Sequence, residues 1–175
     1  MAEQAQVTHV PGRPDSAGLD LEYVFSIRIF LKERIRFSPV TPRGGRFYVP
    51  PAHGDVFGPK LQGKVLPYSG AEWPRGRKDH VFEINAHYML EAADGTPIYI
   101  HNRGYNYSRD ADGRPVPYGV GEGFASNAHR YLRVTPEFDA PEGPHDWLTR
   151  TVIVGMGTRY SDPQDNAVFD YYRVL

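Results

Sequence analysis

Polar side chains that could do acid–base chemistry recur at every second position of two neighbouring segments, and they share one face of each segment if both are strands. They are Glu83, Asn85 and His87 in the first segment and Tyr99, His101 and Arg103 in the second. A histidine can take or give a proton near neutral pH, and an arginine can hold a carboxylate or stabilise an enolate. If the two faces coincide at a cavity, His87, His101 and Arg103 are the predicted catalytic residues, and the other three are predicted to bind substrate. The alternative is a solvated sheet face without a function.

A loop before the first of these segments supplies two more candidates, Glu72 and Trp73. A tryptophan at the mouth of a cavity can stack on a planar ligand, and a buried glutamate can act as a base. We predict that both bind substrate. The alternatives are a tryptophan that closes one end of the fold and a carboxylate exposed on a loop.

The spacings typical of metal sites and of activated nucleophiles do not occur. The seven histidines form no His-x-His and no His-Glu-x-x-His, the chain has no cysteine, and it has no Gly-x-Ser-x-Gly. We therefore expect neither a metal nor a cofactor, and the absence of cysteine also excludes disulfides.

Charge and hydropathy exclude two classes of partner. Lys and Arg total 20 against 21 for Asp and Glu, so the basic excess typical of nucleic-acid binding is missing. The sequence contains no apolar run long enough to span a membrane. Its first residues lack the basic and apolar regions of a secretory signal, which predicts a cytoplasmic protein.

The elements that must position these side chains are predicted to be strands. Apolar residues alternate with polar ones in short runs separated by Gly and Pro, and Asp94-Gly95 between two such runs is typical of a hairpin. The predicted strands cover 21–31, 35–40, 46–49, 60–66, 81–93, 98–107, 130–138, 148–158 and 167–175. We predict an all-β protein, with a flexible arm over 1–19 and a single antiparallel β-barrel over 20–175, because a barrel removes exposed edges.

A long loop is predicted over 108–127, where Gly and Pro are frequent. This segment and the strand before it also carry apolar and aromatic residues, which are normally buried. We expect the loop to cover the barrel mouth or to pack against a second subunit, and we favour a homo-oligomer.

Several short motifs occur in the order typical of one known family. They are His53-Gly54-Asp55-Val56-Phe57-Gly58-Pro59-Lys60-Leu61-Gln62-Gly63-Lys64-Val65-Leu66-Pro67, Ala71-Glu72-Trp73, Ile98-Tyr99-Ile100-His101-Asn102-Arg103-Gly104, Tyr131-Leu132-Arg133-Val134-Thr135-Pro136-Glu137-Phe138, Trp147-Leu148-Thr149-Arg150-Thr151 and Phe169-Asp170-Tyr171-Tyr172-Arg173-Val174-Leu175. The chain resembles the DUF3237 (UPF0311) family over residues 20–175. The resemblance implies a closed barrel, lipocalin-like or allene-oxide-cyclase-like, with a cavity for a small molecule. Thr149, where the family tends to have Asn, joins the predicted substrate-binding residues.

Three functions follow from these observations. The leading hypothesis is a cofactor-independent lyase, isomerase or cyclase that acts on a small, largely apolar, aromatic or oxygenated metabolite in the barrel cavity. The alternative is a barrel that binds a small molecule without catalysis. The third is a subunit that supports a partner enzyme.

Overall fold

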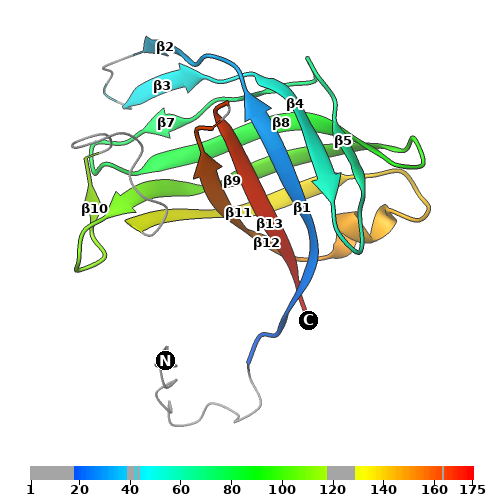
Figure 1. Cartoon of the computed structure of the whole chain (residues 1–175). Coiled ribbons are helices and arrows are strands. Elements are labelled where there is room, and N and C mark those ends of the chain that lie inside the picture. The colour runs from blue at the N-terminus through cyan, green and yellow to red at the C-terminus, as the bar shows by residue number, and fades with distance from the viewer. Residues whose placement is uncertain (1–17, 39–41, 43, 118–128, 163) are drawn as a thin grey trace.

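The structure is a computed structural model, which describes residues 18–38, 42, 44–117, 129–162 and 164–175 (Figure 1). Its elements are β1 (Leu21–Leu31), β2 (Ile35–Ser38), β3 (Gly45–Tyr48), β4 (Pro51–Phe57), β5 (Gly63–Val65), β6 (Ala71–Glu72), β7 (Arg75–Gly76), β8 (Phe82–Ala92), β9 (Pro97–Arg109), β10 (Pro115–Val116), β11 (Arg130–Asp139), the 3₁₀ helix η2 (Asp146–Arg150), β12 (Ile153–Tyr160) and β13 (Asn166–Val174).

The predicted all-β barrel is confirmed. Eight antiparallel strands close a ring in the order β9, β11, β12, β13, β1, β4, β5 and β8, and β8 pairs back to β9. A ring leaves no unpaired edge among its own members, which is the advantage that favoured a barrel. No predicted strand covers β4, which lies between two predicted strands.

The β8–β9 hairpin is one of the two longest pairings in the barrel. Its register joins Phe82 to Asn106 at one end and Glu91 to Pro97 at the other. Gly95 has a φ of 85°, a conformation that glycine adopts without strain, and the Asp94 carboxylate accepts a hydrogen bond from the Thr96 amide (3.0 Å). The hairpin predicted from Asp94-Gly95 therefore forms.

Four short strands extend the sheet beside the first half of β8. β7 and β6 pair with β8, β3 pairs with β7, and β2 pairs with β3 (Figure 1, upper left). β6 and β7 fall in a segment predicted to be a loop, because each strand has only two residues and shows no alternation. These strands build one wall of the site described below.

The opposite end of the barrel is closed by η2 (orange in Figure 1). Leu148 is buried, and the ring of Trp147 packs edge-on against Phe25 with centroids 6.4 Å apart. The prediction that a strand begins at residue 148 is wrong. Adjacent strand residues point to opposite faces, whereas Trp147 and Leu148 both pack against the core, which a helical turn allows.

The predicted loop over 108–127 is shorter than expected where the structure describes it. Residues 108 and 109 belong to β9, and β10 pairs with that end of β9. Residues 118–127 and most of the predicted arm, residues 1–17, lie outside the described part of the chain. Across the described ranges, no helix has the length and hydropathy needed to cross a membrane.

Candidate functional site

The alternation of side chains along β8 and β9 decides what faces the barrel interior. On β8, Ile84, Ala86 and Tyr88 are buried, and the positions between them are only half-buried. On β9, Asn102 is buried and lies opposite Ala86. The hairpin therefore presents a mostly apolar inner wall to which Tyr88, Asn102 and Asn106 add polar side chains.

A cavity of about 130 Å³ lies inside the barrel, at the end opposite η2. It is bounded by the last residues of β1, the first half of β8, the second half of β9 and the short strand β3. Its apolar lining consists of Ile29, Leu31, Phe47, Val49, Pro51, Pro74, Phe82, Ile84, Ala86, Leu132, Ala167 and Phe169. Its polar lining consists of Arg34, Glu72, Tyr88, Asn102, Asn106 and Arg159.

Glu72 brings a carboxyl group to this cavity. It lies opposite Ala86 in the β6–β8 pairing, and two backbone hydrogen bonds with Val49, both 2.9 Å, hold it from the other side. Its side chain is half-buried. Burial raises the pKa of Glu72, whereas the charges of Arg159 and Arg34 act in the opposite direction.

Two guanidinium groups stand near Glu72, and one aspartate connects them. Arg34 Nη2 lies 3.1 Å from Asp165 Oδ2, and Arg159 forms an ion pair with the other oxygen of the same carboxylate. The backbone carbonyl of Asp165 accepts a hydrogen bond from the Leu31 amide (2.9 Å), which fixes the aspartate beside the end of β1. Three segments that are distant in the sequence thus meet at one side of the cavity.

His87, His101 and Arg103 lie together, but on the outer face of the barrel. The two imidazole rings stack with centroids 3.8 Å apart, and Arg103 forms an ion pair with Glu137 of β11. The residues that alternate with them point inward, so these three side chains face away from the cavity. The prediction that they act inside the barrel is therefore wrong about their position.

Asn85 and Tyr99 belong to the same outer cluster as the two histidines. Asn85 Oδ1 accepts a hydrogen bond from His101 Nε2 (2.8 Å), and the Tyr99 hydroxyl lies 2.5 Å from His87 Nδ1. Burial lowers the pKa of His101, and the neighbouring His87 and Arg103 lower it further. No group of three His, Asp or Glu side chains with metal-binding geometry occurs in the part of the chain that the structure describes.

The other predicted site residues also lie outside the cavity, with one exception. Trp73 is exposed on the outer surface, where its ring contacts Tyr48 with centroids 4.8 Å apart. Thr149 lies in η2 at the closed end and donates a hydrogen bond to the Asp146 carbonyl (2.8 Å). Trp73, together with Glu83, Asn85 and Arg103, lines a groove of about 380 Å³ on the outer face. Glu72 is the predicted site residue that lines the cavity.

Sequence reasoning missed five polar residues of the cavity: Arg34, Tyr88, Asn102, Asn106 and Arg159. A signal existed for Tyr88 and Asn102, because each is a polar position within the more apolar face of a predicted strand. For Arg34 and Arg159 the sequence holds no comparable signal.

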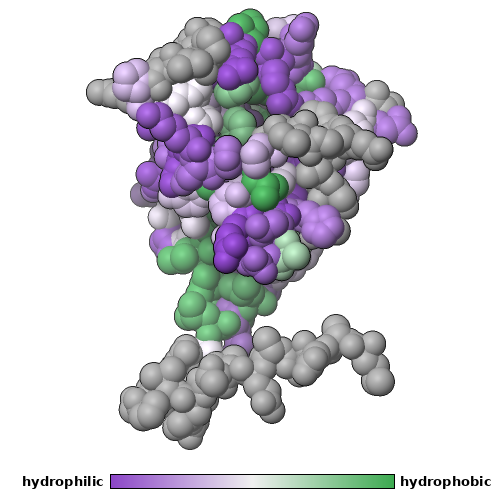
Figure 2. Space-filling view, turned by 90° about the vertical axis from the view of Figure 1, so that its left-hand side faces the viewer, coloured by the Kyte–Doolittle hydropathy of each residue, from purple (hydrophilic) through white to green (hydrophobic). Residues whose placement is uncertain are grey.

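The surface at this end of the molecule is largely hydrophilic (Figure 2). A larger apolar region lies below it, where β1 begins and β13 ends. The exposed hydrophobic residues Leu19, Leu21 and Leu175 belong to these two chain segments. The surroundings of the cavity thus differ in polarity from the opposite edge of the barrel.

Comparison with known proteins identifies relatives over nearly the whole chain. A UPF0311 protein of Clostridium acetobutylicum is 30% identical over 156 residues, covering 89% of this chain and 94% of that protein. The crystal structure of a protein of unknown function from the same organism has a TM-score of 0.76, with 26% identity over 90% of this chain and 98% of the other.

Two further solved structures share the fold. A β-barrel-like protein from Acinetobacter baumannii has a TM-score of 0.74 at 22% identity, covering 93% of this chain and 100% of its own. An enzyme from Penicillium herquei has a TM-score of 0.67 at 16% identity, covering 95% of this chain and 100% of its own. Residues 19–174 match the sequence profile of the family described as protein of unknown function DUF3237. The chain therefore belongs to the DUF3237 family, as its motifs predict.

Proposed function

We propose that this chain is a cofactor-independent lyase, isomerase or cyclase that acts on a small, largely apolar, oxygenated metabolite in the barrel cavity. The observation that carries the proposal is Glu72, a carboxyl group with a raised pKa on the wall of a mostly apolar cavity. A carboxyl group whose pKa moves toward neutrality can take a proton in one step and return it in the next. Glu72 thus takes the role that the sequence assigned to the two histidines.

An isomerisation needs only the substrate and Glu72. The Glu72 carboxylate removes a proton from a carbon beside a carbonyl group, the C–H electron pair forms a new C=C bond, and the carbonyl π pair moves to oxygen. Glu72 then gives a proton to a different substrate atom, either the proton it removed or one exchanged with solvent, while the electrons of the enolate return. Protons and electrons balance without a co-reactant.

The charges beside Glu72 support this chemistry. An enolate carries its negative charge on oxygen, and fixed positive groups at a cavity of low polarity stabilise such a charge strongly. Arg34 and Arg159 supply these groups, and their ion pairs with Asp165 orient them. The enzyme from Penicillium herquei adds an argument by analogy of fold alone.

A barrel that binds a small molecule without changing it is the second candidate. The apolar lining favours it, because two-thirds of the residues around the cavity are apolar and apolar walls suffice for binding. This candidate requires no proton transfer, so the two functions differ in a measurable way.

The test is a screen of oxygenated metabolites with product analysis by mass spectrometry and NMR. Isomerisation in deuterated water adds a signature, because Glu72 exchanges its proton with solvent between the two steps. We expect Glu72→Gln to lower turnover about 100-fold or more. Glu91→Gln is the matched control, because Glu91 is on the same strand that pairs with Glu72 but forms an ion pair with Lys64 (2.7 Å) away from the cavity.

Three results would count against the proposal. Binding of metabolites without turnover or deuterium incorporation would favour the binding barrel. Full turnover by Glu72→Gln would remove Glu72 from the mechanism. Turnover that disappears in the His87→Ala, His101→Ala double variant while Glu72→Gln stays active would favour the outer cluster.

A further inference from the structure

Three fully buried polar side chains occupy the interior of the barrel below Glu72. Tyr88 of β8 is 2% exposed, Asn102 of β9 is 1% exposed and Tyr171 of β13 is 0% exposed. Tyr88 and Asn102 line the cavity. The mechanism proposed above does not use any of the three, although polar groups at such depth are rare in a core.

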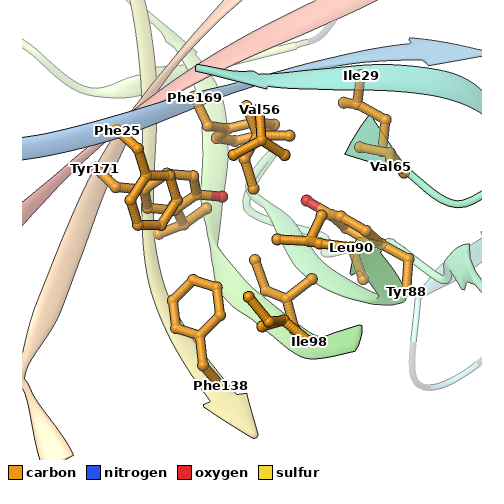
Figure 3. Packing of buried hydrophobic residues seen from close by; sticks show 14 of the residues in the cluster. Phe25, Ile29, Val56, Val65, Tyr88, Leu90, Ile98, Phe138, Phe169 and Tyr171 are labelled. Carbon is orange, nitrogen blue, oxygen red and sulfur yellow. The ribbon is translucent and has the colours of Figure 1, made fainter. Parts of the chain in front are cut away.

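Their geometry brings them to one place. The hydroxyl groups of Tyr88 and Tyr171 point toward one another across the barrel (Figure 3). Asn102 lies opposite Ala86, two positions from Tyr88 on the same inner face, which is the diagonal neighbour position in an antiparallel pair. The Asn102 amide lies near enough to Tyr171 to affect the ionisation of its hydroxyl group.

The three groups interact with one another only weakly. Tyr171 lies within reach of both Tyr88 and Asn102, but within the described residues neither tyrosine hydroxyl nor Asn102 Oδ1 has a hydrogen-bond partner of normal geometry. Buried polar groups are nearly always paired, and leaving one unpaired costs free energy. Burial raises the pKa of Tyr88 and of Tyr171, so both hydroxyls keep their protons and can donate.

We propose that Tyr88 and Asn102, with Tyr171 behind them, form a subsite for a neutral hydroxyl group on an otherwise apolar ligand of about one ring. A hydroxyl group donates to Asn102 Oδ1 and accepts from a tyrosine hydroxyl, and so it matches an acceptor beside a donor. The size follows from the cavity, about 130 Å³, because a cavity of about 150 Å³ is large enough for benzene.

This inference rests on the proposed function and makes its substrate class more specific. Glu72 lies opposite Ala86, one strand away from the subsite, and its charge is close enough to raise the pKa of Tyr88. A phenol or enol whose oxygen binds at Tyr88 would then lie in the same cavity as the Glu72 carboxyl group. The subsite would hold the oxygen while Glu72 moves the proton.

The experiment compares phenol with toluene, which has a methyl group in place of the hydroxyl group. Dissociation constants are measured by NMR titration for the wild type, Tyr88→Phe, Asn102→Leu and Tyr105→Phe. We expect the wild type to prefer phenol about tenfold, which corresponds to one net hydrogen bond, and both cavity variants to lose this preference. Tyr105→Phe removes a hydroxyl from an exposed side chain on the outer face and should keep it.

Thermal unfolding of the same variants separates recognition from folding. Tyr88→Phe removes a buried hydroxyl without a hydrogen-bond partner of normal geometry, so its melting temperature should not fall. If the role of this hydroxyl were purely structural, the melting temperature would fall. Three outcomes overturn the inference: no phenol binding by the wild type, equal binding of toluene, or a phenol preference that survives in both cavity variants. Glu72→Gln should retain the phenol preference, so the subsite and the proposed proton transfer can fail independently.

Discussion

Filling the cavity from Ala86 is the sharpest test of the space that both proposals need. Ala86 is buried and lines the cavity beside Glu72 and Asn102. Leucine at this position adds three carbon atoms, enough to fill roughly half of the cavity. At about 24 cal/mol per Å³, the whole 130 Å³ corresponds to about 3 kcal/mol, so the Ala86→Leu variant should gain about 1–2 kcal/mol in the free energy of unfolding.

The matched control is an alanine of the same strand with no space beside it. Ala92 is 4% exposed and belongs to the core but not to the cavity lining. Overpacking at such a site costs about 1–3 kcal/mol, so Ala92→Leu should destabilise the protein. Urea denaturation gives both free energies, and NMR titration with toluene should show that Ala86→Leu no longer binds the ligand.

Equal destabilisation by the two leucine variants would refute the reasoning, because it would mean that the barrel is as tightly packed at Ala86 as at Ala92. Stabilisation without loss of toluene binding would locate the ligand elsewhere, and the outer groove would be the next place to look.

Three further predictions concern ionisation and assembly. Burial raises the pKa of Glu72 in the folded state, so ionisation of Glu72 lowers the free energy of unfolding. Glu72→Gln should therefore be more stable than the wild type above the folded pKa, by about 1.4 kcal/mol for each unit by which folding raises that pKa. Urea denaturation at several pH values should show this difference vanish toward pH 4, and a difference that does not change with pH would contradict the prediction. His101 should titrate below its ordinary pKa by NMR and move upward in Arg103→Gln, since the guanidinium disfavours the imidazolium; an unchanged value would exclude that charge as a cause. The homo-oligomer predicted from the sequence should give a mass above 19.8 kDa in light scattering, and a mass equal to one chain would reject it.

The hairpin shows how far the sequence could predict this fold. Alternation and Asp94-Gly95 were sufficient for β8, β9 and their turn, because these signals are local. Alternation separates two faces of a strand but does not say which face is inside. The polar face of the hairpin attracted attention because it holds two histidines, yet the inner face is the one with Tyr88 and Asn102.

The charged part of the site could not be predicted for a different reason. Arg159 and Asp165 meet across the turn between β12 and β13, but Arg34 joins them only because β1 pairs with β13. No periodicity relates their positions in the chain. Glu72 was a candidate only through its residue type, and its importance depends on burial by β3 and β8, which the sequence does not reveal.

The 3₁₀ helix η2 closes one end of the barrel. Among the described residues, Trp147 and Leu148 close the end of the barrel at η2, so we expect a molecule to enter and leave the cavity at the other end, beside β3. Substrate and product would then pass through the same opening, and the two could not occupy the cavity at the same time. We expect product inhibition to be strictly competitive with substrate. We also expect substitutions in β2, β3 and β7, beside the opening, to alter the rates of ligand association and dissociation while the eight-strand ring keeps its stability.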